Sequence, residues 1–89
     1  MQKFKITVNK NQGLNSRPSK EIAEKASEFK SNVSILYNGR KVNGKTAYGI
    51  ESLQLHGIHN IVEVTVIIHG SDEAIAAEEL KKFFEVQKY

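Results

Sequence analysis

Apolar and polar residues alternate with a period of two at three places in the chain, the pattern of strands that bury one face. The first two runs, within residues 3–8 and 33–37, place on one side the apolar residues Phe4, Ile6, Val8, Val33, Ile35 and Tyr37. The third run, residues 61–68, is almost continuously β-branched, with Val62, Val64, Val66 and Ile68 on one face. Such a run is typical of a central strand that helices cover.

A hairpin is predicted at Asn38-Gly39, because both residue types tolerate a positive φ. The chain is expected to return over residues 40–45 as a short strand with Val42 inward. Residues 55–60 read as a loop.

Three helices are predicted between these strands. From Ser16 onward, Ile22, Ala23, Ala26 and Phe29 fall at helical spacing, with charged residues on the other side. A short second helix should begin at the N-cap Thr46, because Ile50 and Leu53 lie three residues apart; Gly49 weakens it. In the last helix we expect Ser71 as the cap, Phe83 beside the core, and an inward stripe of Ala74, Ala77, Leu80 and Phe84.

The predicted order is strand, helix, two strands, helix, strand, helix. A four-stranded antiparallel sheet covered on one face by three helices buries all these stripes in one core, which makes the fold α+β. The 89 residues suffice for one domain, residues 1–89, and not for two.

Composition narrows the classes of function. The chain has no cysteine and no apolar run long enough to span a bilayer, and its first residues lead straight into a strand pattern. We therefore expect a cytoplasmic protein without disulfides or membrane contact. The net charge is +3, but the lysines are scattered among ten acidic residues, so nucleic-acid binding is not expected.

Residues 13–18, Gly-Leu-Asn-Ser-Arg-Pro, form the most informative stretch. Asn15 suits a helix N-cap, and Pro18 falls where a missing N–H costs little. With the helix dipole and the Arg17 guanidinium, Asn15 and Ser16 would make an anion or phosphoryl-binding site. The Asn15 amide cannot itself accept a phosphoryl group, because its nitrogen lone pair is delocalised.

This hexapeptide resembles the Gly-Leu/Ile-His-x-Arg-Pro signature of HPr, the phosphocarrier family of the bacterial phosphoenolpyruvate-dependent sugar phosphotransferase system, with Asn15 in place of the active-site histidine. Residues 44–53 resemble the family's regulatory segment, with Thr46 at the usual serine. Gly70-Ser71-Asp72-Glu73 also matches. The three segments span nearly the whole chain, apart from extra residues near 56–60. The resemblance implies an open-faced β-sandwich.

The resemblance also implies partners and site residues. Arg17, which in the family stabilises the phosphoryl group, would here help to recognise an acidic or phosphorylated surface. An ATP-dependent HPr kinase acts on the regulatory residue in some relatives, so Thr46 is either a phosphoacceptor or simply a helix cap. Enzyme I and the A-type sugar-specific domains would dock on a surface that includes Arg17, Lys20, Ala47, Tyr48 and Glu51. Glu51 stands where relatives present an apolar side chain, which disfavours that docking.

No other residues suggest catalysis. His56 and His59 lack a third ligand for zinc, and His69 is an ordinary strand-end histidine. We expect no metal, no cofactor and no enzymatic activity, because no nucleophile and base pair or nucleotide-binding glycine loop is evident.

The leading hypothesis is an HPr-like regulatory or binding protein, similar to Crh-type members of the family in which an amide residue also replaces the histidine. It would act by docking on a transcription regulator or a metabolic enzyme, as in catabolite repression. One alternative is a phosphocarrier seen as an inactive His-to-Asn variant, natural or engineered. Another is a domain that binds a small anion at Asn15 and Arg17.

Overall fold

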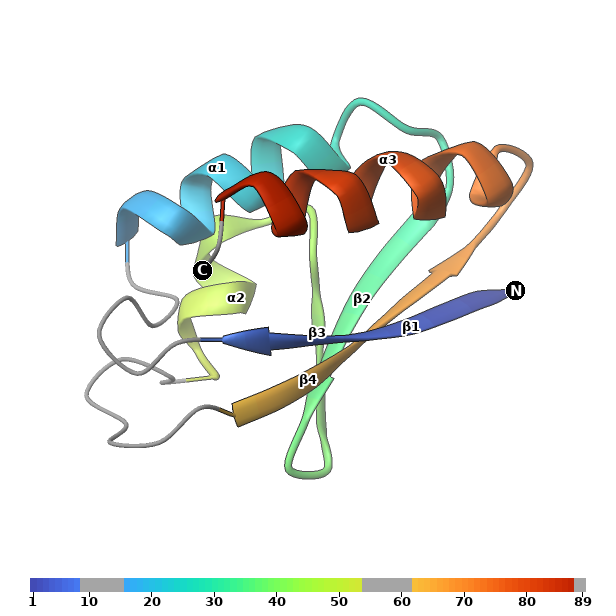
Figure 1. The fold of residues 1–89 in the computed structure, drawn as a ribbon. Helices are drawn as coiled ribbons and strands as arrows, with labels where there is room; N and C mark the ends of the chain where they lie inside the picture. Colours follow the sequence, from blue (N-terminus) through green and yellow to red (C-terminus); the bar gives the residue numbers. More distant parts are fainter. Residues whose placement is uncertain (9–15, 54–61, 88–89) are drawn as a thin grey trace.

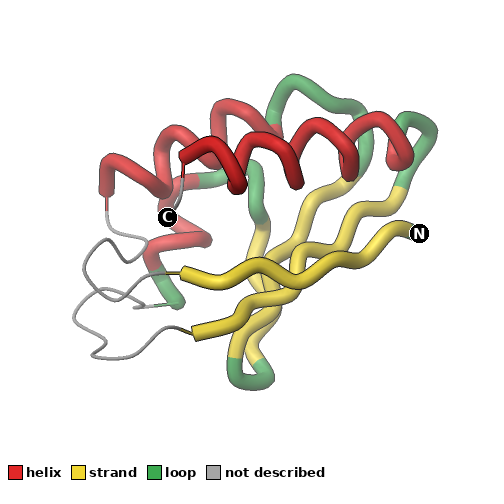
Figure 2. The backbone as a smooth tube through the Cα atoms, viewed as in Figure 1, coloured by secondary structure: helices red, strands yellow, loops and turns green. Residues whose placement is uncertain are grey.

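A computed structural model describes residues 1–8, 16–53 and 62–87 of the chain. One antiparallel sheet carries three helices on a single face (Figures 1 and 2). The strands are β1 (Gln2–Val8), β2 (Asn32–Tyr37), β3 (Arg40–Asn43) and β4 (Val62–His69), in the order β1-β4-β2-β3. The helices are α1 (Ser16–Ala26), α2 (Ala47–Glu51) and α3 (Glu73–Gln87). The predicted α+β fold and its element order are confirmed.

The strand β4 is central, as its β-branched sequence predicts. It pairs antiparallel with β1 on one side and with β2 on the other. Val64, Val66 and Ile68 are almost fully buried beneath the helices. The residues between them point to the other face, because successive side chains of a strand alternate.

The β2–β3 hairpin turns at the predicted dipeptide. Asn38 and Gly39 have φ values of +50° and +81°, which match the twist of the flanking strands. Tyr37 and Arg40 therefore pair directly across the turn. Val42 of β3 is partly buried and packs against the core, as expected.

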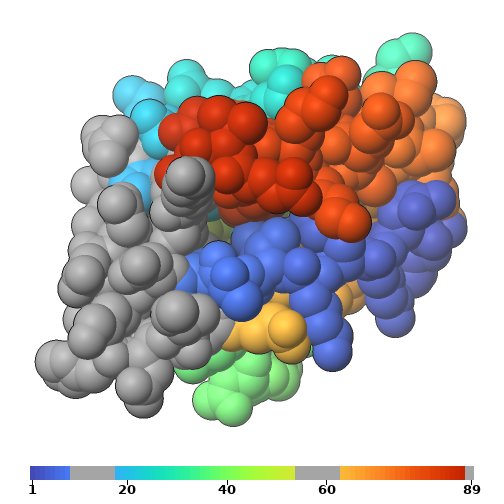
Figure 3. Space-filling view, in the orientation of Figure 1, coloured from blue at the N-terminus to red at the C-terminus, as the bar shows by residue number. Residues whose placement is uncertain are grey.

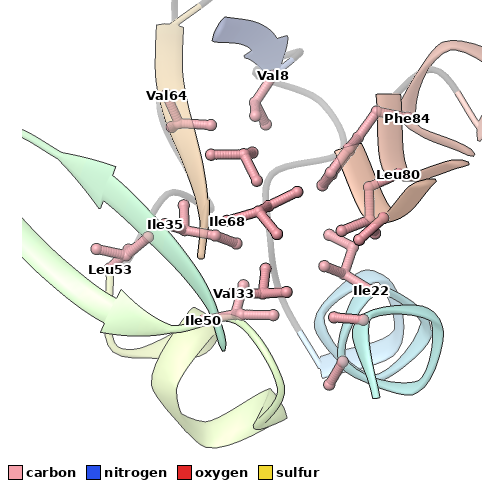
Figure 4. Close-up of a cluster of buried hydrophobic side chains, with 14 residues drawn as sticks. Val8, Ile22, Val33, Ile35, Ile50, Leu53, Val64, Ile68, Leu80 and Phe84 are labelled. Carbon is pink, nitrogen blue, oxygen red and sulfur yellow. The ribbon is translucent and has the colours of Figure 1, made fainter. Parts of the chain in front are cut away.

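The core lies between the sheet and the helices. Figure 4 shows side chains from β1, β2 and β4 meeting those of α1, α2 and α3. Ile22, Ile50 and Leu80, one from each helix, are fully buried there. Figure 3 shows α3 lying along β1 on one side of the molecule, and the two elements are in contact.

Two details of the predicted helices are wrong. The helix α1 ends at Ala26, so Phe29 lies beyond it, although it still packs against the core. In α3 the buried residues are Ala76, Leu80 and Phe84, at a spacing of four, whereas Ala74 is exposed. Ala77 and Phe83 are partly buried beside them, as predicted.

The start of α3 also differs from the prediction. The helix begins at Glu73, and Ser71 lies in the preceding turn. A carboxylate oxygen of Glu73 accepts a hydrogen bond of 3.1 Å from the Gly70 amide in the turn before the helix. The Met1 ammonium pairs with the other oxygen. Both contacts hold the pKa of Glu73 below its usual value, and the Met1 ammonium has the larger effect of the two.

Asp72 ties the start of α3 to the segment between α1 and β2. Its carboxylate accepts hydrogen bonds from the Lys30 amide (2.8 Å), the Ser31 amide (2.9 Å) and the Ser31 hydroxyl (2.5 Å). These bonds, that of the Ser31 hydroxyl foremost, lower the pKa of Asp72 to about 2. The neighbouring Gly70 leaves room for this contact, because a Cβ there would lie 2.6 Å from the Ser31 Cα.

Candidate functional site

The first part of the predicted site is the start of α1. The helix begins at Ser16, and Asn15 precedes Ser16 in the sequence. Pro18 lies in the first turn, where its missing N–H costs no helical hydrogen bond, and it is buried together with Ser19. Asn15 and the side chains of Ser16 and Arg17 lie outside the described part of the structure. Their role in binding an anion therefore stays a prediction.

The second part is the start of α2, where Thr46 is the N-cap as predicted. Its backbone is extended, with φ −123° and ψ 131°, and its hydroxyl oxygen accepts a hydrogen bond of 3.2 Å from the Gly49 amide. The same hydroxyl donates to the Asn43 carbonyl at 3.4 Å. Thr46 is nevertheless exposed. Its hydroxyl thus has a structural role and remains on the surface.

Gly49 permits this arrangement. A Cβ at position 49 would lie 2.7 Å from the Thr46 hydroxyl oxygen and 2.8 Å from the Asn43 carbonyl oxygen. Glycine lowers helix propensity, which is why the sequence alone suggests a weak helix. The structure shows that the missing side chain is what lets the cap approach the helix.

Side chains that the sequence analysis did not single out fix the surroundings of α2. Arg40 donates a hydrogen bond of 2.7 Å to the Ser52 carbonyl just past the end of the helix. Lys45 donates one of 2.7 Å to the Phe29 carbonyl, beyond the end of α1. From the sequence, Arg40 could be recognised only as an arginine directly after the Asn-Gly turn, which does not indicate that it bonds to Ser52. Both bonds hold α2 in place from outside the core.

The residues predicted to meet partners lie on α1 and α2, which pack against each other (Figure 1). Tyr48 is 83% exposed, so most of its ring is available for contact. Lys20 is exposed on α1, while Ala47 and Glu51 are partly buried on α2. Ala47 packs against the core, whereas Ile50 supplies the buried anchor of this short helix. The structure therefore presents Tyr48 and Lys20 to solvent and leaves Glu51 partly accessible.

The remaining candidates for chemistry are three histidines. His56 and His59 lie outside the described residues. His69 ends β4, as predicted, with an exposed side chain whose Nδ1 lies 3.8 Å from a Glu73 carboxylate oxygen. Among residues 1–8, 16–53 and 62–87, no three histidine or acidic side chains come together to hold a metal. None of the described helices is both long and apolar enough to cross a membrane.

Fold and site together define a small protein with a four-stranded sheet under three helices, in which α2 begins at the N-cap Thr46 beside α1. The family model described as "PTS HPr component phosphorylation site" matches residues 2–86. The chain belongs to this family, the HPr proteins of the phosphotransferase system. Members of the family are phosphocarriers and not enzymes.

Individual relatives agree with this assignment. The phosphocarrier protein HPr of Buchnera aphidicola subsp. Baizongia pistaciae is 32% identical over 83 residues, which cover 93% of this chain and 94% of the relative. The histidine-containing phosphocarrier protein of Mycoplasma has a similar structure, with a TM-score of 0.82 and 28% identity over 93% of this chain and 91% of its own. Crh, the catabolite repression protein of Bacillus subtilis, is 34% identical over 82% of this chain and 80% of its own, with a TM-score of 0.69.

Proposed function

We propose that this HPr-family protein is a cytoplasmic regulatory or binding protein of the phosphotransferase system and carries no phosphoryl group at position 15. The observation that carries the proposal is the asparagine directly before the first residue of α1. A carboxamide nitrogen is not nucleophilic, so the family's phosphoryl transfer lacks its acceptor. The similarity to Crh, a catabolite repression protein, supports a regulatory role.

Thr46 is the proposed site of regulatory phosphorylation. Its hydroxyl is exposed, so a kinase can reach it without unfolding the core. The hydroxyl oxygen already accepts from the Gly49 amide, and a phosphate at the start of a helix is electrostatically tolerated. Phosphorylation would then add about two negative charges beside Tyr48 and change what this surface binds.

The proposed partners are proteins that dock on the surface formed by the starts of α1 and α2. Tyr48 supplies an exposed aromatic ring, the type of side chain that commonly anchors interfaces. Arg17 and Lys20 supply positive charge for an acidic or phosphorylated partner. Glu51 is the unfavourable element for an apolar partner, because a charge buried without a counter-ion is costly. A transcription regulator or a metabolic enzyme is therefore favoured over enzyme I and the A-type domains.

Intact-mass and peptide-mapping analysis after two incubations tests the proposal. The first incubation contains enzyme I and phosphoenolpyruvate, and the second contains HPr kinase and ATP. We expect one phosphate at Thr46 in the second incubation and none in the first. The Thr46→Val variant, which keeps the side-chain shape and loses the hydroxyl, should remain unmodified. Phosphate on a histidine would refute the proposal, and no phosphate in either reaction would remove its regulatory part.

The Asn15→His variant separates the missing acceptor from a lost partner surface. If enzyme I phosphorylates this variant efficiently, the docking surface for the ordinary partners is intact and only the acceptor is missing. We expect slow or absent transfer because of Glu51. The double variant Asn15→His/Glu51→Leu should transfer faster, whereas an equal rate in both variants would show that Glu51 does not oppose docking.

A further inference from the structure

The helices leave one face of the sheet uncovered (Figure 2). Two rows of side chains cross this open face from β1 to β3, as the strand register shows. One row is Lys3, Ile67, Ser34 and Asn43, and the next is Lys5, Thr65, Leu36 and Lys41. Two partly buried aliphatic side chains, Ile67 and Leu36, therefore lie near the middle of the sheet, diagonal to each other.

Positive charge surrounds this aliphatic pair. Lys3 and Lys5 stand on β1 at one edge and Lys41 on β3 at the other, and all three are exposed. Lys5 lies 3.7 Å from the carboxylate of Glu63, the one acidic residue of β4. Within the part of the chain that the structure describes, Lys3 and Lys41 form no ion pair. Two ammonium groups are thus left to attract a negatively charged partner to either side of Ile67.

The open face is hollowed at the end where β1 and β2 begin. The depression has a volume of about 450 Å³, and Ser34, Lys41, Asn43, Ile67 and His69 contribute to its lining. None of the described residues that line it is acidic. It offers an aliphatic floor at Ile67, with hydroxyl, amide and ammonium groups around it.

We propose that this face of the sheet docks an acidic polypeptide segment of a partner protein, with apolar side chains on Ile67 and Leu36 and carboxylates at Lys3 and Lys41. Charge complementarity with the lysines requires a partner segment of negative charge. The aliphatic centre selects a polypeptide over a nucleic acid, because sheets that bind single strands stack bases on aromatic rings. In the described strands, no aromatic side chain points to this face. The surface is separate from the starts of α1 and α2, so the proposal does not depend on phosphorylation.

An NMR titration of the full-length, amide-labelled protein tests this docking surface. The probe is a short peptide of repeated Glu-Glu-Leu units, and its Gln-Gln-Leu counterpart is the control. We expect the acidic peptide to shift the amides of β2 and β4 around Ser34 and Ile67, with the Gln peptide at least several-fold weaker. Shifts confined to the starts of α1 and α2, or equal binding of both peptides, would overturn the proposal.

Charge-matched variants locate the site. Lys3→Gln/Lys41→Gln and Lys81→Gln/Lys82→Gln each remove two positive charges, the first pair from the open face and the second from α3. We expect the first pair to weaken peptide binding by about 3- to 10-fold, because exposed charge contacts are individually weak. The second pair should change the binding little. Equal weakening by both pairs would show that net charge alone attracts the peptide.

Two further measurements address the apolar contact and the competing ligand. Ile67→Thr keeps a β-branched residue in the strand and removes the aliphatic floor, so peptide binding should weaken while the amide spectrum stays folded. Unchanged binding would refute the aliphatic contact. A thymidine oligonucleotide should shift these amides less than the acidic peptide does. If the oligonucleotide shifts them more, the proposal is overturned and this face binds a nucleic acid instead of a polypeptide.

Discussion

Replacing Gly49 by alanine sets two physical effects against each other. In a helix interior, alanine is favoured over glycine by about 0.8–1 kcal/mol, so propensity alone predicts a more stable protein. The added Cβ, however, would lie 2.7 Å from the Thr46 hydroxyl oxygen and 2.8 Å from the Asn43 carbonyl oxygen. Neither distance is tolerated without movement of the cap or of the end of β3.

We expect the steric effect to be larger. Overpacking of this kind costs about 1–3 kcal/mol, and relief by moving Thr46 would also weaken its cap bond to the Gly49 amide. The net result for Gly49→Ala is a loss of about 1 kcal/mol in the free energy of unfolding. For a domain of this size, that loss lowers the midpoint temperature by about 4–8 °C.

Urea unfolding followed by far-UV circular dichroism measures this loss, and a double-mutant cycle assigns it. Thr46→Ala removes one of the two contacting oxygens and leaves the Asn43 carbonyl in place. Gly49→Ala should therefore cost less in the Thr46→Ala background than in the wild-type protein. If Gly49→Ala instead stabilises the protein by about 1 kcal/mol in both backgrounds, the steric argument for this glycine is refuted.

Three further changes test the core, the α3 start and the helix cap. Leu80→Ala, at a fully buried position, should lower the free energy of unfolding by about 2–5 kcal/mol in urea titrations; a loss below 1 kcal/mol would contradict the packing described. Folding lowers the pKa of Asp72 from 3.8 to about 2. The contribution of Asp72 to the free energy of unfolding is therefore fully present above pH 4 and is lost as the pH falls toward 2. In Asp72→Asn, the unfolding midpoint should depend less on pH across that window. An unchanged pH dependence would show that the three hydrogen bonds of Asp72 do not cause it. Thr46→Ala should lower the free energy of unfolding by about 0.5–1 kcal/mol in thermal unfolding, whereas Thr46→Ser, which keeps the cap hydroxyl, should leave it nearly unchanged. Equal losses in the two variants would show that the methyl group and not the hydroxyl matters.

Local patterns predicted most of the fold. Alternation identified β1, β2 and β4, and the β-branched run identified β4 as the central strand, since both signals depend on which face is buried. The strand β3 was predicted as the return of the hairpin. The Asn-Gly turn and the Thr46 cap were predictable because each rests on the chemistry of one or two residues. The errors lie at helix ends. Ser71 was predicted as a cap from its residue type and Ala74 as inward from its spacing. In the structure, Asp72 accepts hydrogen bonds from Lys30 and Ser31, which no local pattern reveals and which fix the start of α3.

The site was less predictable than the fold. The exposure of Tyr48 was expected only from the family resemblance, which places this residue on a docking surface. In the structure it follows from the packing of α2 through Ile50. The bonds from Arg40 and Lys45 join segments that only the tertiary structure brings together. The anion-binding role of Asn15, Ser16 and Arg17 remains a prediction from the motif. Tertiary contacts of this type have no local signature in the sequence.

The position of β4 in the sheet has a consequence for folding during synthesis. Among the strands that the structure describes, β1 pairs with β4 alone, so the pairing of Gln2 with Ile68 must wait until Ile68 has left the ribosome. Until then, only the β2–β3 hairpin can form between strands that are neighbours in sequence. Pairing of distant segments slows folding, and the edge of β1 that faces β4 stays unpaired until β4 has been synthesised. Nascent chains that stall before β4 should therefore be the forms that chaperones and proteases meet.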